Sequence, residues 1–136
     1  MSKKILKGLK DVCESYDTFF IDIWGVIHNG IQLYPKSIEV LENLMKKKKR
    51  FVLMSNAPRP SKNVEKLLLK LKMNKVFFKN IFTSGQATLK SLESNKYGET
   101  FYHLGPKRDN DLLKTFEKRK RKLSEADFIL CTGFLD

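Results

Sequence analysis

The chain has 136 residues, 41% of them apolar, and a formal net charge of +12. This length fits one ordinary domain, and the apolar share is enough for a core. No run of about 18 apolar residues occurs, which excludes a predicted membrane span, and the N-terminus lacks the apolar segment of a signal peptide. Cys13 and Cys131 have no metal-ligand spacing, so we predict a cytoplasmic protein whose two thiols pack as small apolar groups.

The positive charge is concentrated in two runs, "KKKKR" at 46–50 and "EKRKRK" at 117–122. Such runs can bind nucleic acid or anionic surfaces, or they can be solvated helix ends. No aromatic residues are interleaved with them, as a binder of single strands would need. We therefore predict solvated faces and expect neither nucleic acid nor a membrane as a partner.

The first half of the chain alternates apolar runs with amphipathic segments. A helix over 4–15, weakened by Gly8, precedes an apolar strand over 18–23 that reads as buried on both faces. The glycine-bounded loop "GVIHNGIQLYP" follows. Further predicted elements are a helix over 36–48, a strand over 50–55 and, after the two prolines of "NAPRPS", a helix over 62–72.

The second half repeats this rhythm. Strands are predicted over 79–85, 100–105 and 126–133, and helices over 86–94 and 109–123. Strands that alternate with helices indicate an α/β fold, a Rossmann-like parallel sheet with helices on both faces. No linker or repeat is visible, so we predict one domain over 1–136.

In a parallel sheet the carboxyl ends of the strands share one edge, and ligands bind beyond that edge. Asp22 is the one acid in the run "FFIDIWGVIHNG", and it ends the first strand. Ser55 and Asn56 end the second strand, 33 positions later, a spacing that allows the two strands to be neighbours.

A carboxylate at such a strand end has three readings. It can act as a covalent nucleophile, it can hold Mg²⁺, or it can accept hydrogen bonds from nearby backbone N–H groups in a turn. Gly25 would let the backbone approach a phosphate or a metal, and Ser55 offers a hydroxyl. The residues by themselves leave these readings open.

The segments "FFIDIWGVIHNG" and "FVLMSNAPRP" resemble motifs I and II of the haloacid dehalogenase superfamily. "QLYPKSIEVLENL", "FTSGQATLKSL" and "ADFILCTG" are similar to its class IIA, the capped sugar- and nucleotide-phosphatase subclass. The resemblance runs from about residue 16 to the end of the sequence. It implies the first half of such a core, with the cap and the C-terminal half beyond "CTGFLD".

The resemblance also implies roles for individual residues. Asp22 would be the nucleophile and would bind Mg²⁺, with the backbone carbonyl of Trp24 as a second metal ligand. Ser55, Asn56 and Gly25 would hold the phosphate of a small phosphorylated substrate. Arg59 and His28 are weaker candidates for substrate contacts, since each is more often an exposed loop residue.

Two departures from the family pattern stand out. Trp24 occupies the place of an acid–base aspartate, and indole cannot shuttle protons. The lysine and acids of the later motifs have no candidate in this sequence, because Asp127 and Asp136 stand in the wrong context.

These departures leave two expectations. The chain is a Mg²⁺-dependent phosphatase acting through an aspartyl-phosphate, incomplete here and completed by a second chain or a second copy. Alternatively, it is a non-catalytic phosphate- or nucleotide-binding or partner-subunit remnant of such an enzyme.

Overall fold

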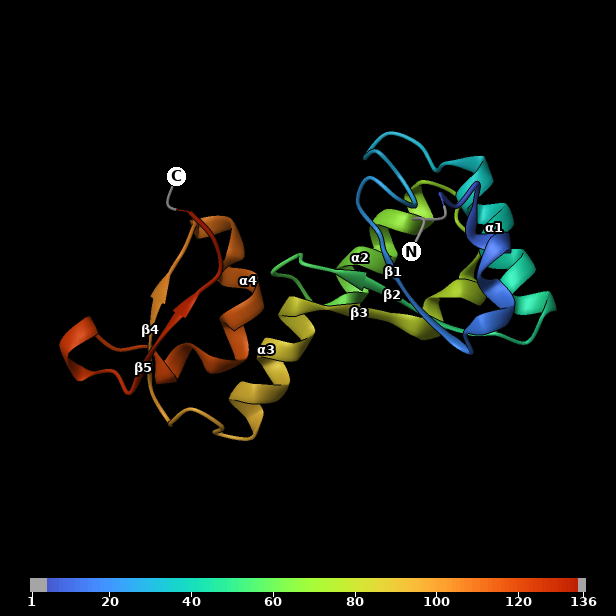
Figure 1. Ribbon diagram of the computed structural model, residues 1–136. Coiled ribbons are helices and arrows are strands. Elements are labelled where there is room, and N and C mark those ends of the chain that lie inside the picture. The colour runs from blue at the N-terminus through green and yellow to red at the C-terminus, as the bar shows by residue number, and fades with distance from the viewer. Residues whose placement is uncertain (1–4, 135–136) are drawn as a thin grey trace. The chain divides into compact units, whose positions relative to one another are not determined.

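The structure, a computed structural model, describes residues 5–134, which divide into two compact units. The first unit contains residues 5–54 and 68–81, and the second contains residues 55–67 and 82–134 (Figure 1). The sequence predicted a single partial core domain over 1–136, and that remains a prediction.

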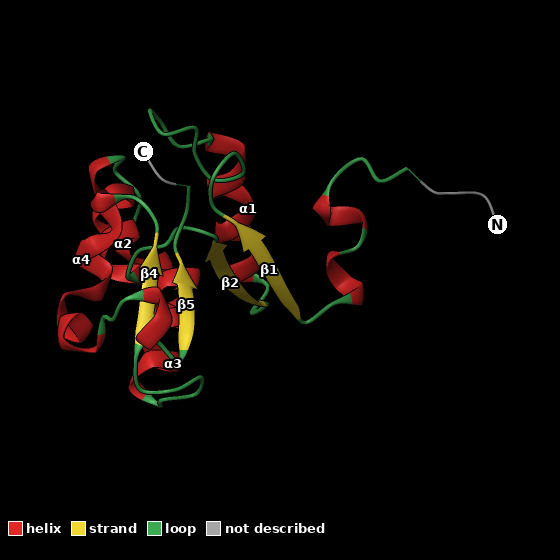
Figure 2. Cartoon of the chain, turned by 90° about the vertical axis from the view of Figure 1, so that its left-hand side faces the viewer, coloured by secondary structure: helices red, strands yellow, loops and turns green. Residues whose placement is uncertain are grey.

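Each of the two sheets contains a parallel pair of strands. β1 (Thr18–Asp22), β2 (Arg50–Ser55) and β3 (Ile81–Thr83) follow the order β1-β2-β3. β1 pairs in parallel with β2, and Asp22 lies opposite Met54. β4 (Phe101–Leu104) and β5 (Phe128–Cys131) form a parallel pair, side by side in Figure 2. The α/β fold of parallel strands connected by helices is confirmed.

The strands β1 and β2 are buried on one face only. Phe51 and Leu53 are 4% and 0% exposed, whereas Phe20 is 72% and Met54 41% exposed. Side chains alternate between the two faces of a strand, so one face packs into the core of the first unit and the other stays open. The prediction that the first strand is buried on both faces is therefore wrong.

Helix α1 (Pro35–Lys46) covers the buried face of the first unit with Leu41 and Leu44. Pro35 stands in its first turn, where a proline's missing N–H costs nothing. The predicted helix over 36–48 is correct apart from its end.

The three longer helices end in the same way. After α1, Lys48 adopts φ 55°, and its N–H donates to Met45 O while the N–H of Lys49 donates to Leu44 O. This left-handed closure recurs at Lys72, after α2 (Ser61–Lys70), and at Asn95, after α3 (Ser84–Glu93). Glycine usually takes this place, and the sequence has lysine or asparagine there instead. Because no glycine marked the ends, the first two helices were predicted to extend too far.

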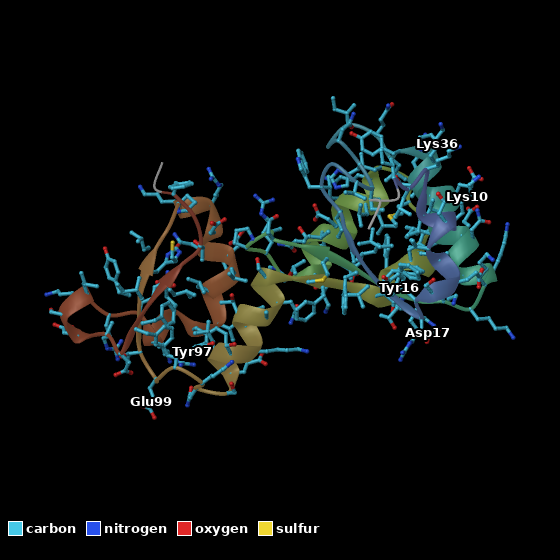
Figure 3. The ribbon with its side chains drawn as sticks, viewed as in Figure 1. Lys10, Tyr16, Asp17, Lys36, Tyr97 and Glu99 are labelled. Carbon is cyan, nitrogen blue, oxygen red and sulfur yellow. The ribbon has the colours of Figure 1, made fainter. Side chains whose placement is uncertain are left out.

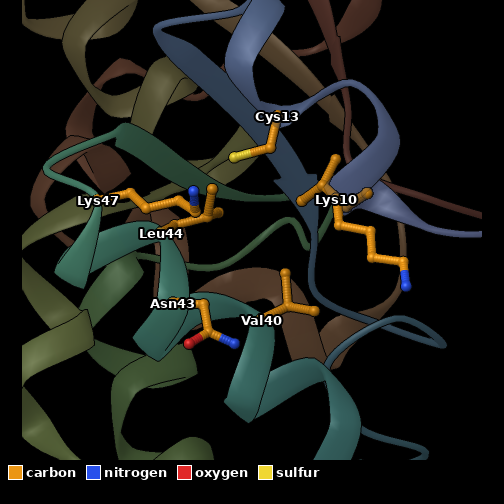
Figure 4. A pocket seen from close by; sticks show the side chains of 7 residues that line it. Lys10, Cys13, Val40, Asn43, Leu44 and Lys47 are labelled. Carbon is orange, nitrogen blue, oxygen red and sulfur yellow. The ribbon is translucent and has the colours of Figure 1, made fainter.

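The N-terminal segment does not form the predicted helix over 4–15. In its described part, residues 5–15, there are only two short 3₁₀ turns, η1 (Leu9–Asp11) and η2 (Cys13–Ser15). Gly8 is fully extended before the first turn, which interrupts a helix at that point. Cys13 is buried facing α1, across a hollow of about 180 Å³ (Figure 4). Cys131, in contrast, is exposed, so the prediction of two packed thiols holds for Cys13 only.

The core of the second unit consists of four buried apolar residues from α3, β4 and α4 (Asn110–Leu113): Leu92, Phe101, Leu112 and Leu113. Thr83 caps α3 by accepting from the N–H of Gln86 at 3.0 Å. Two more 3₁₀ turns in the chain are η3 (Lys75–Asn80), capped by Asn74, and η6 (Leu123–Glu125). η3 and β3 take the place of the strand predicted from residue 79.

The predicted basic helix over 109–123 is wrong. The chain forms the turn η4 (Lys107–Asp109), then α4, then the turn η5 (Lys114–Arg119), and leaves helical geometry at Lys120. The Arg119 guanidinium donates to the carbonyl oxygens of Leu92 (2.6 Å), Gly98 (2.9 Å) and Glu99. These bonds compete with a continuous helix, and they make Arg119 half-buried rather than part of a solvated face.

Among residues 5–134, no helix has the length and apolarity needed to traverse a lipid bilayer.

Candidate functional site

Asp22 lies exposed at the carboxyl end of β1. Its Oδ1 accepts a hydrogen bond from the N–H of Ile23 at 2.8 Å, and that N–H also donates to Met54 O at 3.0 Å. No other described residue donates to the carboxylate, so Oδ2 is available to a ligand. The carboxylate avoids the desolvation that a strand buried on both faces would impose, because it stands on the open face with Phe20 and Met54.

The loop after β1 is closed by its own backbone. Ile23 O accepts from the N–H of Ile27 at 2.8 Å, and Gly25 donates its N–H to His28 O at 2.8 Å. Gly25 has φ 76°, a conformation in which a side chain would be strained. The carbonyl of Trp24 accepts no hydrogen bond from residues 5–134. It is therefore a second oxygen without a structural partner, two positions after Asp22.

The indole of Trp24 is 61% exposed and packs edge-on against His28, with ring centroids 5.2 Å apart. Gly30 has φ 90°, a conformation that favours glycine, and a Cβ there would lie 2.8 Å from the indole Cη2 and would displace the ring. The position that resembles the family's acid–base group thus carries an aromatic side chain that braces the loop.

His28 is 2% exposed, so its predicted exposure in a loop is wrong. Its Nδ1 accepts from the N–H of Gly30 at 2.8 Å, which is the bond of a neutral imidazole. Burial lowers the pKa of His28 and favours that neutral form. The ring holds the loop together by its contacts with Trp24 and Gly30, which explains why a histidine is buried here.

The second unit contains the other predicted residues. Half-buried Ser55 accepts at Oγ from the N–H of Ala57 at 3.2 Å, so its hydroxyl hydrogen stays free for an acceptor. Asn56 is exposed. Ser84 donates its hydroxyl to Asn56 O at 2.8 Å and to Ala57 O at 2.9 Å. Ser84 therefore holds the backbone of the turn that follows β2.

Thr83, Ser84 and Gly85 support this turn; the sequence placed Thr83 and Ser84 at a strand end but gave none of the three a role in the site. Thr83 donates to Arg59 O at 2.6 Å, and a Cβ on Gly85 would collide with the backbone of Arg59. The stretch "TSG" after a short strand was the available signal. The Arg59 side chain is exposed, as expected for a loop residue.

The register of β1 and β2 confirms that Asp22 and Ser55 belong to neighbouring strands. Asp22 lies opposite Met54, and Ser55 is the next residue of β2. Asp22, Trp24 and Gly25 belong to the first unit and Ser55 and Asn56 to the second.

Asp22 also lines a hollow of about 440 Å³ in the first unit. Lys36 and Ser37, at the start of α1, line the same hollow (Figure 3 labels Lys36). The hydroxyl hydrogen of Ser37 is already used, because it is donated to Val26 O at 2.6 Å. Lys36 is exposed, and it is a cation that lines the same hollow as Asp22 and that sequence reasoning did not select.

A magnesium ion suits the chemistry of the free oxygens. Mg²⁺ prefers oxygen ligands and usually keeps several waters beside one or two carboxylates. Asp22 Oδ2 and the Trp24 carbonyl are oxygens of the kind that this ion binds. Over residues 5–134 no group of three or more His, Cys, Asp or Glu side chains could hold a metal.

Comparisons with known proteins identify the family. The model of the haloacid dehalogenase-like hydrolases matches residues 19–118. No curated protein matches the chain. A haloacid dehalogenase-like hydrolase from Brucella suis 1330 superimposes with a TM-score of 0.77 at 26% identity, over 97% of this chain and 48% of that one.

Two more distant structures share the fold. A p-nitrophenyl phosphatase from Archaeoglobus fulgidus has a TM-score of 0.65 at 20% identity, over 83% of this chain and 43% of that one. A glycerol phosphate phosphatase from Mycobacterium tuberculosis, in complex with magnesium, has a TM-score of 0.62 at 17% identity, over 90% and 38%. The chain thus spans less than half of each neighbour, and it belongs to the haloacid dehalogenase-like hydrolase family.

Proposed function

We propose that this chain supplies the nucleophile of a Mg²⁺-dependent phosphatase that acts on a small phosphorylated metabolite through an aspartyl-phosphate. The observation that carries the proposal is the exposed Asp22 carboxylate at the end of β1, with one oxygen free of structural hydrogen bonds from residues 5–134. Because the chain spans 48% of its neighbour from Brucella suis, the activity is assigned to the completed core.

The reaction follows from the chemistry of a carboxylate nucleophile. An Asp22 oxygen attacks phosphorus, a P–O bond to Asp22 forms, and the P–O bond to the leaving alcohol breaks. Water then attacks the phosphorus and releases Asp22 and inorganic phosphate. Magnesium, when bound at Asp22 and the Trp24 carbonyl, would offset the repulsion between carboxylate and phosphate.

The other predicted residues bind rather than react. The free hydroxyl hydrogen of Ser55 and the exposed turn at Asn56 would hold the transferring phosphate, and Gly25 would let the backbone approach it. Trp24 cannot give the leaving alcohol a proton, so that proton would come from solvent. A positioned acid contributes about 10²–10⁴-fold, and we therefore expect slow turnover.

The test is hydrolysis of p-nitrophenyl phosphate and of a panel of small phosphate esters, with Mg²⁺ and with EDTA. The chain is assayed by itself and together with a polypeptide that supplies the remaining half of the core. We expect Mg²⁺-dependent release of phosphate from the completed core. Activity that survives in Asp22→Asn would overturn the proposal.

The alternative is a non-catalytic phosphate- or nucleotide-binding module, or a partner subunit, derived from such an enzyme. Trp24 at the acid–base position favours it, as does the lack of a metal-binding side-chain cluster among residues 5–134. Calorimetric titration with phosphate and Mg²⁺ separates the two functions. Binding without turnover in the completed core supports the alternative.

We further propose that the partner that completes the core is a second chain or a second copy of this one. A cytoplasmic location is also part of the proposal. Sedimentation of the chain over a range of concentrations distinguishes self-association from a requirement for a different polypeptide.

A further inference from the structure

A second hollow lies in the first unit at the end of the strands opposite to Asp22. It has a volume of about 620 Å³. We call this hollow the basic groove and define it by six of the residues that line it: Met45, Lys48, Lys49, Arg50, Val76 and Lys79. Arg50 is the first residue of β2, and Thr18, the first residue of β1, also lines the hollow. The basic groove is thus separate from the proposed phosphatase site.

Most of the cations of the basic groove are not neutralised. Lys49 lies 3.6 Å from the Asp17 carboxylate and 4.0 Å from that of Glu14. Lys48, Arg50 and Lys79 are exposed, and none of them has a side-chain ion pair or hydrogen bond with residues 5–134. Lys48 and Arg50 belong to the basic run that follows α1 and begins β2, and the fold adds Lys79 of η3 to them.

The wall of the basic groove is apolar. Met45 is 40% and Val76 46% exposed, although apolar side chains of this size are usually buried. A ligand in the basic groove would therefore contact the aliphatic side chains of Met45 and Val76 and would lie near three cations that have no ion pair within the described chain. An acidic protein segment that alternates carboxylates with apolar side chains complements both properties.

Nucleic acid fits the basic groove less well. Binding of single strands relies on exposed aromatic faces on which the bases stack. Phe51 is the one aromatic residue that lines the groove in the described chain, and it is only 4% exposed. The groove supplies charge without a stacking surface.

We propose that the basic groove is a docking site for an acidic, partly apolar segment of a partner protein. The charges of Lys48, Arg50 and Lys79 attract its carboxylates, while Met45 and Val76 contact its apolar side chains. Occupancy of this site needs neither Asp22 nor magnesium.

The probe for the test is a fluorescein-labelled twelve-residue peptide of alternating glutamate and leucine, titrated with the full chain at roughly 0.1 M salt, where surface charges more than about 10 Å apart are screened. The groove variant is Lys48→Gln/Arg50→Gln/Lys79→Gln. The matched control, Lys62→Gln/Lys66→Gln/Lys70→Gln, removes the same charge from exposed lysines of α2 outside the groove. Circular dichroism checks that both variants are folded.

We expect the groove variant to weaken peptide binding about tenfold or more and the control less than twofold, which corresponds to about 1.4 kcal/mol or more for the groove. A peptide with serine in place of leucine should also bind more weakly. Equal losses in the two variants would show that net charge alone attracts the peptide and would overturn the proposal. Absence of binding, or displacement of the peptide by an equal concentration of polyuridylate, would overturn it too.

Discussion

Asp22 and Asp127 are both exposed aspartates next to parallel strands, but they have opposite relations to their surroundings. Asp127 Oδ2 accepts three hydrogen bonds, from the N–H groups of Glu99 (2.9 Å) and Thr100 (2.8 Å) and from the Thr100 hydroxyl (3.0 Å). Asp22 accepts one, from the adjacent N–H of Ile23. The comparison indicates that, among the described residues, the Asp127 carboxylate joins separate segments of the fold, whereas the Asp22 carboxylate does not.

The hydrogen bonds of Asp127 join the chain before β4 to the chain before β5. A Cβ on Gly98 would lie 2.6 Å from the Asp127 Cβ, so this glycine permits the close approach. The pKa of Asp127 is lowered, mainly by the backbone and hydroxyl hydrogen bonds from Thr100. Sequence reasoning rejected Asp127 as a metal ligand, and its contacts show a structural role.

The largest predicted effect separates the two carboxylates. Asp22→Asn should lower kcat/KM of the completed core by about 10³-fold or more, because the amide cannot act as the nucleophile. Its urea unfolding midpoint should stay close to that of the parent, since one local hydrogen bond is involved. A large loss of stability in Asp22→Asn would contradict the comparison.

Trp24→Asp tests whether the lack of an acid–base group limits the rate of the completed core. It places a carboxyl group where the related motif has its acid–base residue, and we expect kcat to rise about 10²-fold in the completed core. Trp24→Phe is the control, because it keeps an aromatic ring beside His28 without adding an acid. An equal change in both variants would show that packing, not proton transfer, limits the rate.

Asp127→Asn should show the reverse pattern, with a lower unfolding midpoint and an unchanged kcat/KM for the completed core. The Asp127 carboxylate of the parent stabilises the fold above the ordinary aspartate pKa of about 3.9. This stabilisation is lost as the pH falls through the lower pKa that Asp127 has in the folded state. Urea unfolding at pH 7 and at pH 3 measures this effect. A deficit in Asp127→Asn that stayed equally large at low pH would contradict it.

The pH dependence of the loop after β1 tests the role of His28. Because burial lowers its pKa, the unfolded chain binds a proton more readily, and stability should fall as the pH drops below about 6.5. Thermal unfolding at pH 7.5 and 5.5 measures the change. His28→Gln should reduce it, whereas His103, whose pKa is also lowered by burial, should account for the remainder.

The smallest effect compares the helix ends of the two units. Lys48→Gly should stabilise the first unit by about 1 kcal/mol, because a lysine at φ 55° is strained and glycine is not. Asn95→Gly should contribute only a few tenths of a kcal/mol, since asparagine tolerates this conformation. Denaturant unfolding of both variants tests the difference, and an equal gain would contradict it.

Much of the architecture was determined by the sequence itself. The alternation of apolar runs with amphipathic segments predicted the parallel α/β fold and β2 within its observed bounds, and the spacing of Asp22 and Ser55 allowed their strands to be neighbours, as β1 and β2 are. These features depend on local periodicity and on general rules for parallel sheets, so one sequence is enough to predict them.

Tertiary structure decided what periodicity does not encode. Phe20 is exposed because one face of β1 has no cover, and His28 is buried because the loop closes around it. The helix predicted over 109–123 is interrupted where Arg119 finds carbonyl partners from residues 92–99. Whether a side chain is covered or bonded depends on segments far away in the sequence, and therefore only the folded chain shows that, within residues 5–134, the Asp127 carboxylate accepts three hydrogen bonds and the Asp22 carboxylate one.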